Sequence, residues 1–179
     1  MSSLSIILGC MYSGKSSELL RRVSRYTSIG IRVCLINSSS DTRTDNSVKT
    51  HSGKRVVAIK IDKLMKLITS GEFLHSPVIA IDEAHFFPDL LEFVKEIEKH
   101  NKIIIVSGLD GDYRREPIGD ILKLIPLCDD VVKLKALDMV DKDGSSAIFS
   151  KRIVESDEQI LVGAQEAYIA VSRKNYLSM

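Results

Sequence analysis

The fold is decided by one stretch near the start of the chain, Leu4-Ser5-Ile6-Ile7-Leu8-Gly9-Cys10-Met11-Tyr12-Ser13-Gly14-Lys15-Ser16. Its first part, Leu4–Leu8, is a mostly apolar run that ends in a glycine and suits a strand buried on both faces. Its second part matches the pattern GxxxxGK[ST] in full, and helical spacing follows it. A strand, this loop and a helix, in that order, form the setting in which the pattern binds phosphate groups.

The chemistry of this loop predicts a site for ATP. The glycines let backbone N–H groups curl around phosphate oxygens, and the start of the helix adds a favourable dipole. Lys15 is expected to bridge the β- and γ-phosphates, and the Ser16 hydroxyl to bind Mg²⁺. The predicted ATP-binding residues are Gly9, Cys10, Met11, Tyr12, Ser13, Gly14, Lys15, Ser16 and Ser17. The other interpretation is a glycine-rich turn that happens to carry a lysine.

A second motif ends another apolar run, at Val78-Ile79-Ala80-Ile81-Asp82-Glu83. In a phosphate-binding fold, an aspartate at a strand end supplies a second contact to Mg²⁺, usually through its water shell, and Asp82 is placed for that role. Glu83 beside it is placed to act as general base on an attacking hydroxyl or water. The alternative is that both acids cap the helix that follows.

The same motif also spells DEAH over residues 82–85, the box of a class of helicases. Those enzymes need two motor domains, whereas 179 residues hold one domain, or one domain with a small lobe. The 25 basic and 24 acidic residues give a net charge of +1, without the basic excess that tracking nucleic acid requires. We therefore expect no nucleic-acid partner.

Strand-like and helix-like segments alternate through the first two-thirds of the chain. This alternation predicts an α/β fold of the P-loop type, a mostly parallel sheet with helices on both faces. The polar stretch 37–54 is predicted to be a loop, and a helix is expected from Gln165 onward. The pattern changes near residue 138, so we expect a P-loop domain over residues 1–137 and a small C-terminal lobe over residues 138–179.

Composition limits the protein class further. Hydrophobic residues make up 44% of the chain, which is enough for a folded core. No apolar run approaches the roughly 20 residues that span a bilayer, and the first residues lack the pattern of a signal peptide. Cys10, Cys34 and Cys128 are widely spaced and form no CxxC pair. We expect a cytoplasmic protein with no membrane partner.

The two motifs and the segments around them resemble the type II thymidine kinases, a family of animals, bacteria and large DNA viruses, over nearly the whole chain. Family members typically open with GPMFSGKS, which corresponds to residues 9–16. Their D-x-R segment is matched by Asp41-Thr42-Arg43, their IDEAQFF by residues 81–87, and their LDGTFQRKPFG by residues 109–119. Their VVKLTA, YTKR and IGG-x-x-x-Y segments match residues 131–136, 149–152 and 162–168.

The resemblance implies transfer of the γ-phosphate of ATP to the 5′-hydroxyl of thymidine, or of deoxyuridine, in deoxynucleotide salvage. Glu83 would accept the hydroxyl proton, and the cationic catalytic residues would be Lys15, Arg43 and Arg115. The implied nucleoside-binding residues are Met11, Asp41, Phe86, Leu109, Tyr113, Ser150, Leu161, Gly163 and Tyr168. Two alternatives stay open: both arginines as solvated surface residues, and the apolar residues of the set as plain core.

The resemblance also implies a lasso, residues 150–167, that holds the base mainly through backbone groups. Peptide donors and acceptors persist whatever the side chain, so such a loop tolerates sequence change. A homo-oligomer, typically a tetramer, is implied as well.

The chain departs from the family at the structural zinc site of the C-terminal lobe. Two CxxC pairs of the family correspond here to Asp138-Met139-Val140-Asp141 and Ser172-Arg173-Lys174-Asn175. Zn²⁺ favours Cys and His, so we expect no zinc. The expectation is a metal-free lobe held by packing and turn hydrogen bonds, and the alternative is a Ca²⁺ or Mg²⁺ site.

Three further departures lie near the implied nucleoside site. His85 replaces a glutamine, Tyr113 a phenylalanine and Ala164 the second glycine of IGG. They keep two alternatives open, a kinase of another deoxynucleoside and a nucleotide-binding regulator that has lost kinase activity. The intact Lys15 and Glu83, with the Mg²⁺ residues, favour a thymidine kinase.

Overall fold

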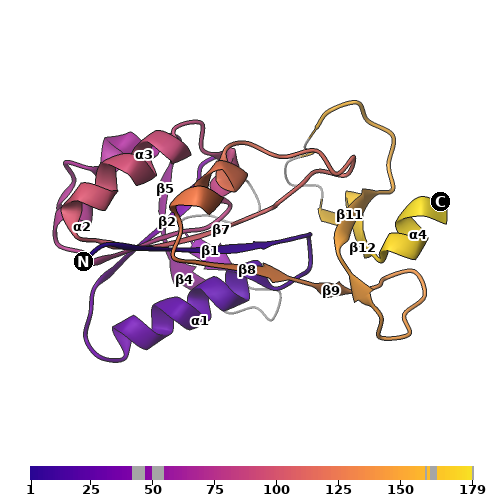
Figure 1. Ribbon diagram of the computed structural model, residues 1–179, viewed down its shortest axis with the longest axis horizontal. Coiled ribbons are helices and arrows are strands. Elements are labelled where there is room, and N and C mark those ends of the chain that lie inside the picture. The colour runs from indigo at the N-terminus through magenta and orange to yellow at the C-terminus, as the bar shows by residue number, and fades with distance from the viewer. Residues whose placement is uncertain (42–46, 50–54, 160, 162–164, 179) are drawn as a thin grey trace.

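The computed structural model describes residues 1–41, 47–49, 55–159, 161 and 165–178. Six strands form its central sheet (Figure 1). In spatial order they are β5 (Ile59–Ile61), β2 (Val33–Ser38), β6 (Val78–Ile81), β7 (Ile103–Gly108), β1 (Ser3–Gly9) and β8 (Asp130–Leu134). Every neighbouring pair is parallel, as the sequence predicts. The carboxyl ends of the strands therefore meet at one edge, where the loops after β1, β6 and β7 lie side by side.

Two hydrophobic cores cover the two faces of the sheet, because successive side chains of a strand point to opposite faces. Ile6 lies in one core and Ile7 in the other. The helix α1 (Lys15–Thr27) packs on the face of Ile7, while α2 (Gly71–Leu74) and α3 (Leu90–Ile97) pack on the opposite face (Figure 1). The expected helices on both faces are confirmed. Among the described helices, none has the length and apolar character needed to cross a bilayer.

Several connections are short 3₁₀ helices: η1 (Leu64–Leu67), η2 (Ala84–Phe86), η3 (Glu98–His100), η4 (Ile121–Leu127) and η5 (Gln165–Ala167). The most important of them is η2, which is separated from the end of β6 by two residues, at the carboxyl edge of the sheet.

The prediction of a loop over residues 37–54 is wrong in part. The strand β3 (Ser47–Lys49) pairs antiparallel with β4 (Arg55–Val57). Val48 is 1% exposed and packs in the same core as Ile7. One apolar residue in a polar stretch gives no readable periodicity, which is why the pattern missed this strand.

The predicted helix from Gln165 onward is also wrong. The strand β12 (Tyr168–Val171) runs antiparallel to β11 (Phe149–Arg152), and the helix α4 begins later, over Arg173–Ser178. A second small ladder joins β9 (Ala136–Leu137) to β10 (Ser146–Ala147). Pairing with β11 decides the conformation of β12, and such long-range pairing leaves no local signal. Figure 1 shows this lobe beyond the carboxyl end of the central sheet.

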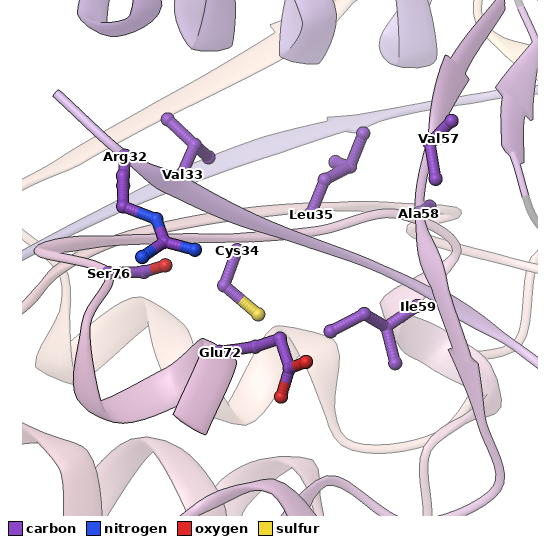
Figure 2. Close-up of a pocket in the computed structure, with 9 residues that line it drawn as sticks. All are labelled: Arg32, Val33, Cys34, Leu35, Val57, Ala58, Ile59, Glu72 and Ser76. Atoms are coloured by element: carbon purple, nitrogen blue, oxygen red, sulfur yellow. The ribbon is translucent and has the colours of Figure 1, made fainter. Parts of the chain in front are cut away.

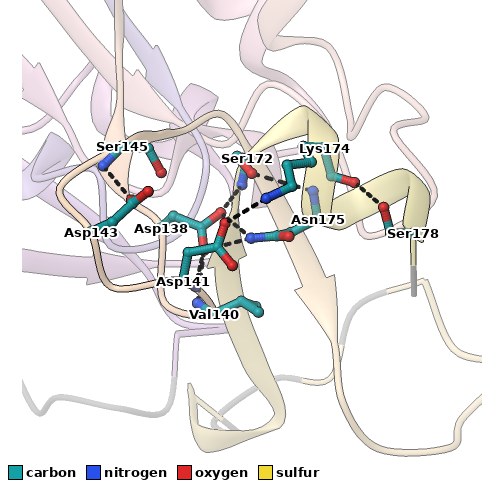
Figure 3. A network of polar contacts seen from close by, with 9 residues as sticks. All are labelled: Asp138, Val140, Asp141, Asp143, Ser145, Ser172, Lys174, Asn175 and Ser178. Carbon is teal, nitrogen blue, oxygen red and sulfur yellow. Dashed lines mark hydrogen bonds and ion pairs between the residues drawn. The ribbon is translucent and has the colours of Figure 1, made fainter.

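A buried carboxylate links the two segments that match the zinc-binding pairs of the resembled family (Figure 3). Asp138 is 3% exposed and accepts hydrogen bonds from the N–H groups of Val140 (2.8 Å) and Asp141 (3.0 Å). It also accepts from the N–H of Ser172 and from Asn175 Nδ2 at 3.0 Å. Among the described residues, no group of three or more His, Cys, Asp or Glu side chains is placed to hold a metal ion.

These hydrogen bonds change the proton affinity of Asp138. Burial alone would raise the pKa of its carboxyl group, but the hydrogen bonds from Ser172, Asp141 and Val140 outweigh burial and hold the pKa below its usual range. The ionised carboxylate therefore stabilises the fold at neutral pH. Its contribution is complete above the ordinary pKa of an aspartate, about 3.9, and is lost as the pH falls toward the lowered value.

We predict that Asp138→Asn lowers the Tm by roughly 5–10 °C at pH 7, since an amide presents a donor to groups that need an acceptor. The difference from the wild type should shrink below about pH 4, where the Asp138 carboxylate of the unfolded chain begins to take up a proton while that of the folded chain stays ionised. Calorimetry from pH 7 to pH 3 measures both effects.

The matched control is Asp141→Asn. The Asp141 carboxylate pairs at 3.2 Å with Lys174, whose side chain is 78% exposed, and exposed ion pairs contribute little. Its Tm should stay within about 2 °C of the wild type. An equal Tm for Asp138→Asn and wild type at pH 7 would contradict the role given to Asp138.

Candidate nucleotide and phosphoryl-transfer site

The loop between β1 and α1 has the backbone that its glycines predict. Gly9 has φ +150°, and a Cβ there would lie 2.6 Å from Ser13 Oγ and 2.7 Å from the Leu134 carbonyl oxygen. Gly14 has φ +85°, in the left-handed region that favours glycine. Both glycines lie where the chain turns from β1 into the first turn of α1 at the carboxyl edge of the sheet, the geometry that the phosphate-binding interpretation predicts.

Lys15 is buried within this loop. It is 8% exposed, and its Nζ donates to the Cys10 carbonyl oxygen at 2.7 Å. Burial lowers the pKa of the Lys15 ammonium, and the charge of Glu83 opposes that shift more than any other group does. Lys15 and Glu83, 68 positions apart in the sequence numbering, are therefore electrostatic neighbours.

Asp82 lies at the end of β6, buried to 3% exposure. Ser107 on the neighbouring strand β7 donates to Asp82 Oδ1 at 2.9 Å, and the Ser16 hydroxyl also hydrogen-bonds to this carboxyl group. Burial, followed by the charge of Glu83, raises the pKa of Asp82 to about 6. The oxygen-only donors of Ser16 and Asp82 fit a hard divalent cation, whose charge would offset the crowding of two carboxylates.

Glu83 has a left-handed backbone, with φ 49° and ψ 40°. Left-handed conformations of non-glycine residues are uncommon, and they cluster at functional sites. Its side chain makes no capping hydrogen bond to η2, and the Asp82 carboxyl group bonds to side chains of other elements. The alternative that the acids cap the next helix is therefore wrong for Glu83, while the Asp82 carboxyl group also accepts a hydrogen bond from the Glu83 backbone.

The lobe docks on the phosphate-binding loop through two of the predicted nucleoside residues. The Met11 N–H donates to Ser150 Oγ at 2.9 Å, across 139 positions of sequence. The Tyr12 hydroxyl donates to the Tyr168 carbonyl oxygen at 3.2 Å. Met11, Ser150 and Tyr168 thus lie together, as the resemblance implies.

Three apolar candidates stand outside the cores. Met11, Phe86 and Leu109 are half-buried, and the buried cores formed by the described residues include none of them. The interpretation of these side chains as plain core is therefore wrong.

The remaining candidates are spread around this edge. Asp41, 4% exposed, accepts from Asn37 Nδ2 at 3.0 Å just beyond β2. The Leu161 N–H donates to the Tyr168 hydroxyl at 3.0 Å. The Arg152 guanidinium lies over the rings of both Tyr113 and Tyr168. Ser17 is exposed in the first turn of α1. Arg43 and Gly163 lie outside the described residues.

Arg115 is exposed, and the structure places it on the lobe. Its guanidinium stacks 4.5 Å from the ring centroid of Tyr176 and 5.6 Å from that of Phe149. These aromatic contacts make Arg115 more than a freely solvated side chain, but they do not connect it to the phosphate-binding loop.

The sequence reasoning missed two residues, Arg152 and Ser107. Arg152 donates from Nη1 to the carbonyl oxygens of Ser156 (2.9 Å) and Glu158 (2.6 Å), and from Nη2 to the Tyr168 hydroxyl (2.6 Å). Its guanidinium also lies 3.9 Å from the Tyr113 ring centroid. The only available signal was the last letter of the matched YTKR segment. For Ser107 it was a polar residue at the end of an apolar strand.

A surface pocket lies elsewhere in the fold (Figure 2). It is lined by the first half of β2, by α2 and by the residues around β4 and β5, namely Arg32, Val33, Cys34, Leu35, Val57, Ala58, Ile59, Glu72 and Ser76. None of the predicted site residues is among its lining residues.

Comparisons with known proteins agree with this geometry. The family described as thymidine kinase matches residues 2–176 of the chain. Similar proteins include the thymidine kinase of vaccinia virus (strain Western Reserve), 40% identical over 97% of this chain and 96% of that protein. The thymidine kinase of sheeppox virus (strain KS-1) is 40% identical over 96% of this chain and 94% of its own length. That of Yaba monkey tumor virus (strain VR587) is 41% identical over 97% of this chain and 94% of its own length. The chain belongs to the thymidine kinase family.

Proposed function

We propose that this protein is a thymidine kinase that transfers the γ-phosphate of ATP to the 5′-hydroxyl of thymidine, or of deoxyuridine, giving the 5′-monophosphate. The observation that carries the proposal is the meeting of Lys15, Asp82 and Glu83 at the carboxyl edge of the sheet, next to the phosphate-binding loop. This set supplies a cation for the phosphates, a metal ligand and a base.

The transfer forms one bond and breaks one bond at the γ-phosphorus. The nucleoside oxygen forms a bond to the γ-phosphorus, and the bond from that phosphorus to the bridging oxygen of ADP breaks. Glu83 takes the proton of the 5′-hydroxyl, and Lys15 offsets negative charge on the phosphates. Arg43 and Arg115 are proposed to assist in that charge neutralisation. For Arg115 this requires the guanidinium to leave Tyr176, on which it stacks.

Ser16 and Asp82 are the residues proposed to hold Mg²⁺, directly or through water. When bound, Mg²⁺ supplies charge neutralisation between the β- and γ-phosphates. Ser107 orients the Asp82 carboxylate by its hydrogen bond, so that the other carboxylate oxygen can face the metal. Residues 9–17 are proposed to cradle the phosphates.

The lasso is the proposed nucleoside-binding element. Met11, Phe86, Leu109 and Tyr113 would line the base pocket, and Tyr168 would close over it. Asp41, Ser150, Leu161 and Gly163 complete the proposed set. The Leu161 N–H donates to the Tyr168 hydroxyl at 3.0 Å, so Leu161 of the lasso is held to the first residue of β12, which follows the lasso.

A homotetramer, a cytoplasmic location and the division into residues 1–137 and 138–179 belong to the same proposal. They come from the family resemblance and the sequence pattern, as does the expectation of a lobe without zinc. The two other functions that the sequence left open, a kinase of another deoxynucleoside and a regulator without kinase activity, are separated from thymidine kinase by the experiment below.

We predict that Glu83→Gln lowers kcat for thymidine phosphorylation by at least about 100-fold, because the amide cannot accept the hydroxyl proton. ATP affinity, measured by titration with a fluorescent ATP analogue, should stay within about twofold. The control is Glu96→Gln, which removes an exposed carboxylate on α3 that pairs with Lys99. An unchanged rate in Glu83→Gln would show that another group is the base. A wild-type protein that binds ATP but phosphorylates no nucleoside would instead favour the regulator.

We also predict that Arg152→Ala raises KM for thymidine about tenfold or more, since it removes the hydrogen bonds that order residues 156–159 and Tyr168. ATP affinity should be unchanged. Arg152→Lys should recover only part of the loss, because an ammonium cannot reproduce the forked geometry of a guanidinium. Lys174→Ala, at an exposed position of the same lobe, is the control, and equal KM values for all four proteins would contradict the role of Arg152.

A further inference from the structure

His85 occupies the middle of η2, two residues beyond the proposed base. Its side chain is fully buried, and its Nε2 lies 3.6 Å from Glu83 Oε2. The η2 turn sets this juxtaposition: the Phe86 N–H donates to the Glu83 carbonyl oxygen at 3.0 Å, and Glu83 is left-handed. A histidine ring and a carboxylate two positions apart therefore face each other.

A backbone contact fixes the tautomer of this ring. The N–H of Leu109 donates to His85 Nδ1 at 3.1 Å. Only an unprotonated Nδ1 can accept a hydrogen bond, so the neutral ring carries its hydrogen on Nε2. That N–H faces the Glu83 carboxylate, and the ring links the carboxylate to the backbone of a proposed base-pocket residue.

Two glycines leave room for His85 in this orientation. A Cβ at Gly119 would lie 2.4 Å from the His85 carbonyl oxygen. A Cβ at Gly108 would lie 3.0 Å from His85 Nδ1. The Phe86 ring lies 4.3 Å from the imidazole, between ring centroids. The backbone around the ring is thus built closely against it, which limits the positions that the imidazole can take.

The His85 Nε2–H lies beside a carboxylate that has charged groups of both signs around it. Lys15 is a cationic neighbour of Glu83 and Asp82 an anionic one, while Asp110, just beyond β7, acts on Lys15 and is paired with Lys133. In a site with two carboxylates, a donor beside Oε2 of Glu83 sets the orientation of its carboxylate. The 3.6 Å separation is longer than a formed hydrogen bond, and such contacts often tighten only when substrate is bound.

We propose that His85 is a positioning residue that holds Oε2 of Glu83 through its Nε2–H, so that Oε1 is directed at the 5′-hydroxyl of the nucleoside. This inference rests on the proposed function and assigns a role to a residue at which the chain departs from the resembled family. A glutamine can do the same work, because its Oε1 can accept from the Leu109 N–H while its amide N–H faces the carboxylate.

The test compares His85→Gln, His85→Leu and His85→Asn with the wild type for kcat, thymidine KM, ATP affinity and Tm. His85→Gln should keep kcat within about threefold. His85→Leu and His85→Asn should lose about 10- to 100-fold in kcat, the effect of removing a hydrogen bond to a charged group, with ATP affinity within about twofold. The asparagine variant keeps the readout if leucine prevents folding, since its shorter amide cannot reach both partners. His100→Leu, on the surface in η3, is the control for histidine removal.

A double-mutant cycle separates positioning from general structural damage. In the Glu83→Gln background, adding His85→Asn should change the single-turnover rate by less than about twofold, because the group that His85 positions is gone. The same 10- to 100-fold loss in both backgrounds would overturn the proposal. So would a wild-type kcat in His85→Asn, or a loss in His85→Gln as large as that in His85→Asn.

The failure of the proposed function has a different signature. A wild-type protein that transfers no phosphate to thymidine overturns that function, and with it the role of His85. An active wild type with unaffected His85→Asn overturns the inference alone.

Discussion

Lys15, Asp82 and Glu83 are buried together at the carboxyl edge of the sheet. The attraction and repulsion between their charges determine which ligands and side chains can lie beside them. A buried ammonium is destabilised by the loss of water, and so is each buried carboxylate, unless an opposite charge lies nearby. Lys15 meets that condition through Glu83, while Asp82 relies on hydrogen bonds from Ser16 and Ser107. The arrangement is therefore least favourable when empty of ligand. It becomes more favourable when phosphates add negative charge beside Lys15 and a divalent cation adds positive charge beside Asp82.

The second constraint is the docking of the C-terminal lobe on the phosphate-binding loop, from which it lies more than a hundred positions away in the sequence. Ser150 and Tyr168 reach the phosphate-binding loop through a hydrogen bond each, to Met11 and from Tyr12. The two strands that carry them are paired with one another, and β12 leads directly into the junction where Ser172 donates to Asp138. A hydrogen-bonded carboxylate thus joins the same two segments of the lobe that a metal joins in the resembled family. The strength of this junction depends on pH, because it relies on the ionised Asp138 carboxylate.

The parts of the structure that follow from local chemistry could be predicted from the sequence. Gly9, Gly14 and Lys15 are specified by the geometry of a phosphate-binding loop, and Asp82 and Glu83 by their place at a strand end. The parallel sheet followed from alternating segments, because buried strands are apolar throughout. The features that were missed depend on partners distant in sequence. Tyr168–Val171 is a strand because Phe149–Arg152 pairs with it, and the periodicity of an isolated segment cannot reveal that.

The candidate site likewise contains residues that the local sequence predicts and residues whose role depends on distant partners. In the sequence, Arg152 looks like any other basic residue, and its role follows from its hydrogen bonds to the segment 156–159. The tautomer of His85 is fixed only by the N–H of Leu109. Both residues act through groups that no sequence spacing brings together. Conversely, Arg115 matched the family segment by position, yet its guanidinium stacks on aromatic rings of the lobe. The position of Arg115 in the matched segment therefore did not predict the contacts of its side chain.

The central claim, that this edge of the sheet phosphorylates thymidine, is tested most directly by phosphate transfer from MgATP to a panel of thymidine, deoxyuridine, deoxycytidine, deoxyadenosine and deoxyguanosine. The account predicts rapid formation of the 5′-monophosphate from thymidine, alone or together with deoxyuridine, and at most slow reaction of the other three. Preferred turnover of one of those three would contradict the assigned nucleoside, and no turnover of any, with ATP bound, would contradict the assigned reaction.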